Sequence, residues 1–135
     1  MKMLSAICFA SIVAFAALSA TAQPSPEASQ EVRNAAVVEK LKAAPGTVAV
    51  YAQGLCCPSC AVGVRKKVVA LKFVDQARLQ EGIELDAKTQ LVTVALKSGK
   101  KVDEKALSKA IKDAGYEPVH IYSLNKKGEL VTKSL

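Results

Sequence analysis

Between residues 47 and 124 the sequence changes repeatedly between two hydrophobic periodicities, and their order restricts the fold more than any other feature. Segments rich in β-branched and aromatic residues predict strands, and segments with apolar residues three and four positions apart predict helices. The expected elements cover about 47–53 (strand), 58–71 (helix), 83–86 (strand), 91–97 (strand), 103–114 (helix) and 117–124 (strand). This order predicts an α+β ferredoxin-like βαββαβ sandwich, with two helices on one face of a four-stranded antiparallel sheet.

Several residues sharpen or extend these elements. Asp103 is suited to cap the start of the second helix, and Gly115 is suited to end it in the left-handed conformation. Residues 73–79 predict an irregular arm before the second strand, with an enlarged loop up to Gly82. An extra helix is expected over 27–44, with one apolar side formed by Val32, Ala35, Ala36, Val38 and Leu41.

The start of the chain predicts export. Lys2 is followed by an almost unbroken apolar run over 4–18 and by a small-residue cleavage site that ends at Ala22. We therefore expect a signal peptide (1–22), a linker with the extra helix (23–46), the main domain (47–124) and a polar tail (125–135), in which 129–132 are a candidate hairpin arm. The expected location is periplasmic or secreted, without stable membrane insertion after cleavage.

The basic charge does not point to nucleic acid. The chain has a formal net charge of +7, but its lysines and arginines are spread over candidate helices and interleaved with acidic and apolar residues. It has no tryptophan, and aromatic residues make up 4% of the sequence, so few rings are available to stack on bases. A solvated basic surface is therefore expected.

Three of the four cysteines lie within five positions, in the segment GLCCPSCA at 54–61. Cys57 and Cys60 are separated by two residues, where the first strand gives way to a helix, and two such thiolates can converge on one soft metal ion. Neither a second pair nor a nearby histidine completes a tetrahedral zinc set. Monovalent copper or divalent mercury, which accept two or three sulfurs, fit this pattern better than zinc.

The loop and its position resemble the heavy-metal-associated (HMA) domain family of copper chaperones, metal-pumping ATPase modules and periplasmic mercury carriers. The family's Gly-Met-x-Cys-x-x-Cys loop is matched over 54–60, and its Gly-aromatic pair after the second helix is matched by Gly115 and Tyr116. The resemblance implies that Cys57 and Cys60 bind the ion and that Tyr116 shields the loop. It also implies a metallochaperone or metal-transport role, with a metal-transporting membrane protein or another carrier as partner.

The loop departs from the family pattern at two positions. Leu55 replaces the usual methionine and is expected to anchor the loop in the core, while Gly54 permits the sharp turn. Cys56 stands where the family commonly has a polar residue, so it is either a third ligand, a small apolar residue turned away from the loop or a participant in disulfide exchange. We expect no enzymatic activity, but a thiol–disulfide oxidoreductase and a structural disulfide remain alternatives for the same pair.

Overall fold

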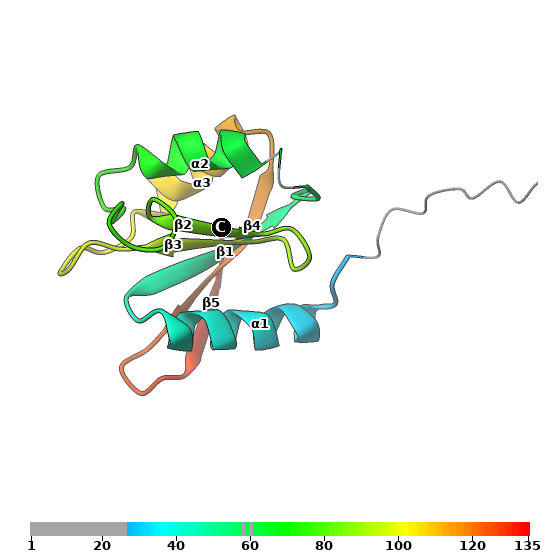
Figure 1. Cartoon of the computed structure of the whole chain (residues 1–135). Coiled ribbons are helices and arrows are strands. Elements are labelled where there is room, and N and C mark those ends of the chain that lie inside the picture. Colours follow the sequence, from blue (N-terminus) through cyan, green and yellow to red (C-terminus); the bar gives the residue numbers. More distant parts are fainter. Residues whose placement is uncertain (1–26, 58, 60) are drawn as a thin grey trace, which may run out of the picture.

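The protein folds as a sheet covered by helices on both faces (Figure 1). The computed structural model describes residues 27–57, 59 and 61–135. The helices are α1 (Gln30–Ala43), α2 (Ala61–Val69) and α3 (Glu104–Asp113). The strands are β1 (Thr47–Gln53), β2 (Ile83–Asp86), β3 (Leu91–Ala95), β4 (Glu117–Leu124) and β5 (Leu130–Ser134).

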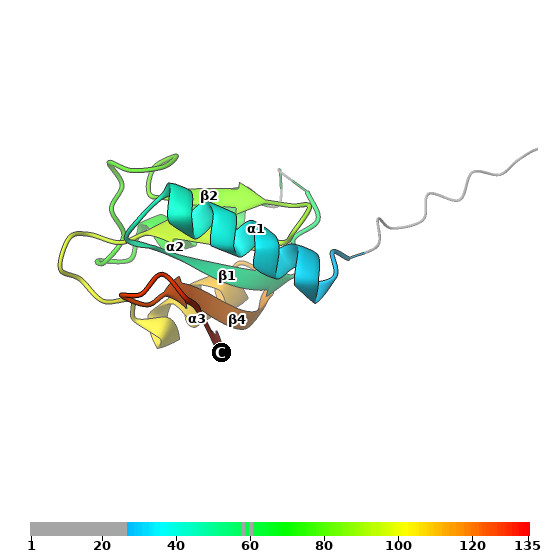
Figure 2. The ribbon, with the colours of Figure 1, turned by 90° about the horizontal axis from the view of Figure 1, so that it is seen from below.

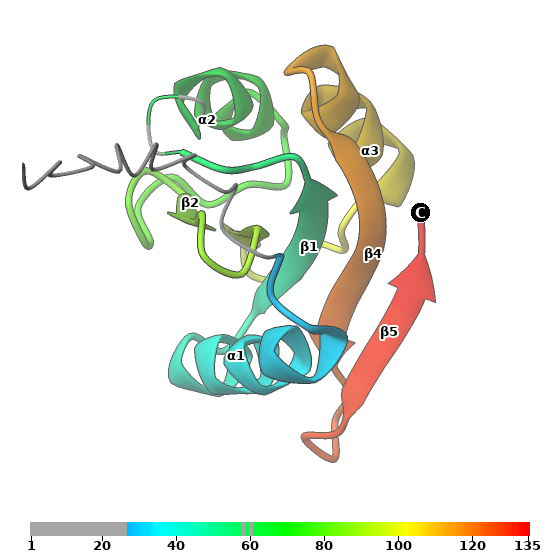
Figure 3. The same cartoon turned by 90° about the vertical axis from the view of Figure 1, so that its right-hand side faces the viewer.

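The strand order in the sheet is β2-β3-β1-β4-β5, and every neighbouring pair is antiparallel. The helices α2 and α3 lie together on one face, and α1 lies on the other (Figure 3). The predicted ferredoxin-like βαββαβ order and the extra N-terminal helix are therefore confirmed. The main core lies between the sheet and α2 and α3, where side chains of every element from β1 to β4 meet.

The sheet has one strand more than expected, because part of the segment 125–135 forms β5. The side chain of Asn125 accepts hydrogen bonds from the N–H groups of Lys127 and Glu129, and Gly128 takes a left-handed φ of 80°. This turn reverses the chain and pairs β5 with β4. The candidate hairpin arm at 129–132 is thus present as β5, which begins at Leu130 and extends to Ser134.

The helix α1 is present, but its apolar side was predicted only in part: Leu41 is buried as expected, and Arg33 and Val37 were not included. Its buried residues are Arg33, Val37 and Leu41, whereas Val32 is 56% exposed. Arg33 can be buried because its guanidinium lies 3.6 Å from the centroid of the Tyr51 ring and donates to the carbonyls of Thr89 and Ala28. Figure 2 shows α1 lying across the sheet, where it covers a second, smaller core.

The irregular arm predicted before β2 is a series of turns. Val74 and Gln80 form isolated bridges, and Leu79 and Glu81 take positive φ angles. At the end of this segment Gly82 is buried with a φ of +89°, and its carbonyl accepts a hydrogen bond from the Ala95 N–H. The end of the enlarged loop between α2 and β2 is therefore hydrogen-bonded to β3.

Candidate functional site

The cysteine loop leaves the sheet through a glycine turn. Gly54 follows β1 with a φ of +91°, a conformation that disfavours side chains with a β-carbon. The N–H of the next residue, Leu55, donates to the Ala52 carbonyl over 3.3 Å, and the Leu55 side chain is fully buried in the main core. The chain is thus fixed immediately before Cys56, and α2 begins at Ala61.

The two described cysteines of this loop, Cys56 and Cys57, differ in oxidation state. Cys56 is exposed and carries a free thiol, whereas Cys57 is half-buried and disulfide-bonded. The Ser59 hydroxyl donates to Cys57 Sγ over 3.5 Å, a contact that the sequence analysis did not single out. Cys60, like the predicted signal peptide 1–22, lies outside the described residues. The structure therefore describes the Cys57 side of the site in an oxidised form.

An aromatic ring approaches the loop from the end of α3. Gly115 ends this helix with a φ of +95°, and the Tyr116 N–H donates to the Ile111 carbonyl over 3.2 Å. A β-carbon built on Gly54 would lie 3.7 Å from Tyr116 Cδ1. Gly54 and Tyr116, which are 62 positions apart in the sequence, are therefore neighbours in space, as the resemblance implied.

The end of β1 is also held by a residue that sequence reasoning missed. The Gln90 carbonyl accepts a hydrogen bond from the Ala52 N–H over 2.9 Å, and Gln90 is buried with a positive φ of 56°. A polar residue between the two predicted strands 83–86 and 91–97 gives no sequence signal for such a role. Gln90 supports the segment from which the cysteine loop starts.

His120 lies among aromatic residues on the side of the sheet that α1 covers. Its ring stacks on Tyr51 with centroids 6.5 Å apart and planes 14° apart, and it lies 6.1 Å from Tyr122. Burial raises the pKa of Tyr51, and the hydrogen bond of its hydroxyl to Glu27 raises it further, so the hydroxyl is protonated at neutral pH. Among residues 27–57, 59 and 61–135, no three or more His, Cys, Asp or Glu side chains are grouped to hold a metal ion.

Within the described part of the chain, no helix is both long enough and apolar enough to cross a membrane.

The exposed surface of α2 is basic, with Lys66 and Lys67 in its last turn.

No protein-family model matches the sequence, and no curated protein matches it significantly. Three solved structures are similar to it. The copper transporter domain Ccc2A from yeast, solved in the apo and Cu(I)-loaded states, is 19% identical, with a TM-score of 0.43 over 53% of this chain and 89% of its own. The CopZ metallochaperone is 20% identical, with a TM-score of 0.44, and the match covers 54% of this chain and 98% of CopZ.

The third structure is oxidised MerP from Ralstonia metallidurans CH34. It is 26% identical, with a TM-score of 0.43 over 53% of this chain and 90% of its own. All three similar structures are heavy-metal-associated metal carriers.

Proposed function

We propose that the chain is an exported carrier, chaperone or sequestering protein for one soft metal ion, Cu(I) or Hg(II). Cys57 and Cys60 bind the ion in this proposal, and Cys56 is a candidate third ligand. The observation that supports it most is the geometry before the cysteines: the Gly54 turn, the buried Leu55 and the neighbouring Tyr116 fix a loop that presents Cys56 at the surface.

The chemistry of the loop favours soft cations. Thiolates are soft ligands, and two or three of them suffice for Cu(I) or Hg(II), whereas a structural Zn(II) site takes four ligands. Within the residues that the structure describes, no three or more His, Cys, Asp or Glu side chains are grouped, and the motif itself holds a single Cys-x-x-Cys pair. Low coordination by sulfur alone is therefore the arrangement that we propose.

Metal binding requires the reduced loop. Because Cys57 is disulfide-bonded here, two electrons from an external thiol reductant must open the disulfide before Cys57 can act as a thiolate ligand. Release to a partner, a metal-transporting membrane protein or another carrier, then proceeds by exchange. An incoming thiolate or thioether joins the ion before one cysteine of this chain leaves it.

A thiol–disulfide oxidoreductase is the second candidate. The disulfide at Cys57 next to the free, exposed Cys56 thiol favours it, because exchange needs a disulfide and an accessible thiol. We rank it second because the loop is set between β1 and α2 of a ferredoxin-like sheet, where the resemblance implies metal binding.

Competition among metals separates the two candidates. Protein reduced under anaerobic conditions is titrated with Cu(I), Hg(II) and Zn(II) against chromophoric chelators, and its turnover of a model disulfide substrate is measured in parallel. We expect one tightly bound Cu(I) or Hg(II) per chain, weaker Zn(II) and negligible turnover. Rapid turnover without soft-metal binding would reverse the assignment.

The Gly54 turn gives a prediction about affinity. Gly54→Val places a β-branched residue at a φ of +91°, which strains the backbone by roughly 1–2 kcal/mol. Because the strain is located where the loop starts, we expect the affinity for Cu(I) to fall by about tenfold or more, the equivalent of about 1.4 kcal/mol. Competition titration measures the affinity, and urea denaturation measures stability.

Gly128→Val is the matched control for this variant. Gly128 also has a positive φ, 80°, but it lies in the turn between β4 and β5, and a β-carbon there meets nothing within 4 Å. We expect it to lower stability by a similar amount without changing the affinity for Cu(I). Equal affinities in the two variants would show that the Gly54 conformation is not needed for binding.

A further inference from the structure

The strand β5 presents a free backbone edge. It is the outermost strand of the sheet and, within the described residues, pairs only with β4. The Leu135 N–H donates to the Val119 carbonyl, and the Asn125 N–H donates to the Glu129 carbonyl. Since hydrogen-bonded residues alternate along an antiparallel pair, odd-numbered residues bond to β4, and the N–H and C=O groups of Leu130, Thr132 and Ser134 point outward.

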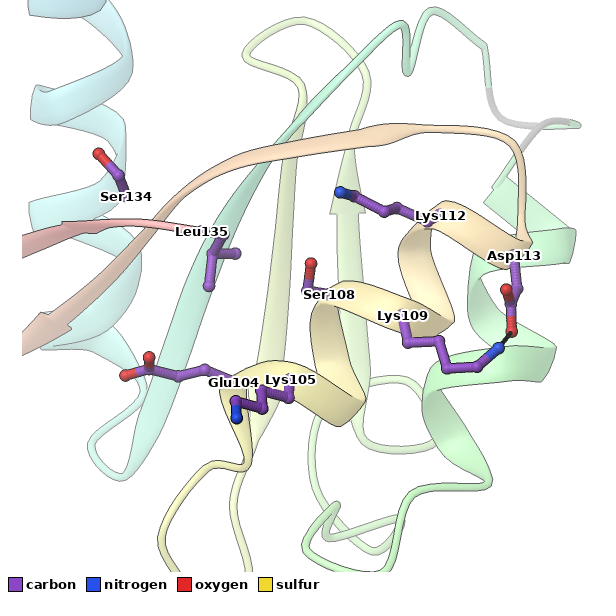
Figure 4. Close-up of a pocket in the computed structure, with 8 residues that line it drawn as sticks. All are labelled: Glu104, Lys105, Ser108, Lys109, Lys112, Asp113, Ser134 and Leu135. Atoms are coloured by element: carbon purple, nitrogen blue, oxygen red, sulfur yellow. Dashed lines mark hydrogen bonds and ion pairs between the residues drawn. The ribbon is translucent and has the colours of Figure 1, made fainter.

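A groove runs beside this edge, between β5 and α3. It has a volume of about 460 Å³, and its walls include Lys105, Ser108 and Lys112 of α3 and Leu135 after β5. Figure 4 shows Ser108 and Lys112 projecting toward the side on which Leu135 lies, whereas Lys109 turns away to pair with Asp113. An ion pair between Lys133 and Glu104 holds the end of β5 against the start of α3.

The surroundings of the edge are basic at both ends. Lys126 and Lys127 lie in the turn before β5, and Lys105 lies at the groove. Among the described residues, no carboxylate forms an ion pair with any of these three lysines. Of the nearby acidic groups, Glu104 is paired with Lys133, and Glu129 accepts a hydrogen bond from the neutral Asn125 amide and keeps its charge. The three lysines outnumber this one carboxylate, so the net unpaired charge at this edge is positive.

The exposed side chains of β5 suit strand addition. Val131 is 45% exposed, and β5 contains neither a proline nor a bulge, two features that commonly protect an edge from pairing. A lysine on the edge is a third such feature, but the one lysine of β5, Lys133, is paired with Glu104. Val131 and Lys133 lie on the α3 side of the strand, since Lys133 reaches Glu104. An extended segment paired with β5 would direct every second side chain toward the same side.

We propose that the free edge of β5 binds an extended segment of a partner protein that carries acidic side chains at alternate positions. The segment pairs with the outward groups of Leu130, Thr132 and Ser134, and its acidic side chains lie near Lys105 and the lysines of the turn. Main-chain bonds supply affinity and the charges supply selectivity. A second copy of β5 is disfavoured because it would bring its own Lys126 and Lys127 turn to the same basic edge. The proposal does not depend on the cysteine loop.

The test uses two acetylated synthetic peptides of equal length, one alternating Glu with Val and the other alternating Lys with Val. Each is titrated into ¹⁵N-labelled protein, and amide shifts and hydrogen exchange are followed by NMR. We expect the Glu peptide to slow exchange at Leu130, Thr132 and Ser134. We also expect it to bind about tenfold or more tighter than the Lys peptide at low salt, with the difference shrinking as salt screens the charges.

Thr132→Pro removes one outward N–H without touching the bonds between β5 and β4, and prolines are tolerated on edge strands. We expect it to bind the Glu peptide about tenfold more weakly, as loss of one or two hydrogen bonds implies. Thr132→Ala should bind like the unchanged protein, and slow exchange at Val131 and Lys133 would show that β5 is intact in both. Equal binding by the two variants, equal or absent binding of the two peptides, or self-association through β5 would overturn the proposal.

Discussion

Replacing Gly82 by alanine is expected to lower the free energy of unfolding by about 2–4 kcal/mol. Gly82 has a φ of +89°, and a β-carbon there would lie 2.5 Å from Val74 Cγ1 and 3.0 Å from the Asp75 carbonyl oxygen. Val74 belongs to the main core and is almost fully buried, so it cannot move aside freely. The variant thus combines a strained backbone with overpacking.

Gly99→Ala is the control for this variant, because Gly99 has a φ of +72° but an alanine β-carbon there meets nothing within 4 Å. Its free energy of unfolding should fall only by the cost of a β-carbon at a positive φ, about 1–2 kcal/mol. Urea denaturation of both variants measures the difference. If Gly82→Ala is no less stable than Gly99→Ala, the close contact with Val74 does not limit this position.

Cys57→Ser is expected to weaken the binding of Cu(I) by more than about 100-fold, since altering even the partners of a metal ligand commonly costs 10–100-fold. A serine hydroxyl is a hard, neutral donor and does not replace a thiolate. The domain should stay folded, because Cys57 belongs to neither hydrophobic core. Competition titration of the reduced variant gives the affinity, and circular dichroism reports on the fold.

Cys56→Ser is the matched variant for this measurement. Cys56 is exposed and precedes Cys57 directly, so this variant tests whether any thiol of the loop can act as a metal ligand. For Cu(I) we expect two sulfur ligands and an equilibrium affinity close to that of the unchanged protein, with Cys56 acting only during transfer. A loss in Cys56→Ser as large as that in Cys57→Ser would make Cys56 a full ligand.

Sequence patterns located the elements that carry strong local signals. The ends of β1 and β4 agree with the predicted 47–53 and 117–124, because each strand is bounded by turn or helix residues. Asp103 caps α3 by accepting a hydrogen bond from the Ala106 N–H, and Gly115 ends that segment with a positive φ, as predicted. Caps and glycine turns are local, so the sequence alone can reveal them.

Contacts between distant segments were harder to predict. The buried side of α1 depends on Arg33, whose charge favours exposure unless a ring such as Tyr51 and free carbonyls are brought to it. The strand β5 carries exposed side chains along most of its length and gives a weak strand signal without the Asn125 turn. Both features depend on partners that only the folded chain supplies.

The same limit applies to the site. The glycine turn and the anchoring leucine could be read from the motif, and their positions in the structure suit those roles. The approach of Tyr116 to Gly54 followed only from the resemblance, because no local pattern joins these residues. The oxidised state of Cys57 depends on redox conditions that a sequence does not encode.

X-ray absorption at the copper edge of the reduced, Cu(I)-loaded protein tests the central claim most directly, because it counts the sulfur atoms bound to the ion. The account predicts a shell of about two sulfurs at one copper per chain, unchanged in Cys56→Ser, and no copper retained by Cys57→Ser or Cys60→Ser. A first shell made of nitrogen or oxygen, or full copper retention in both of the latter variants, would contradict it.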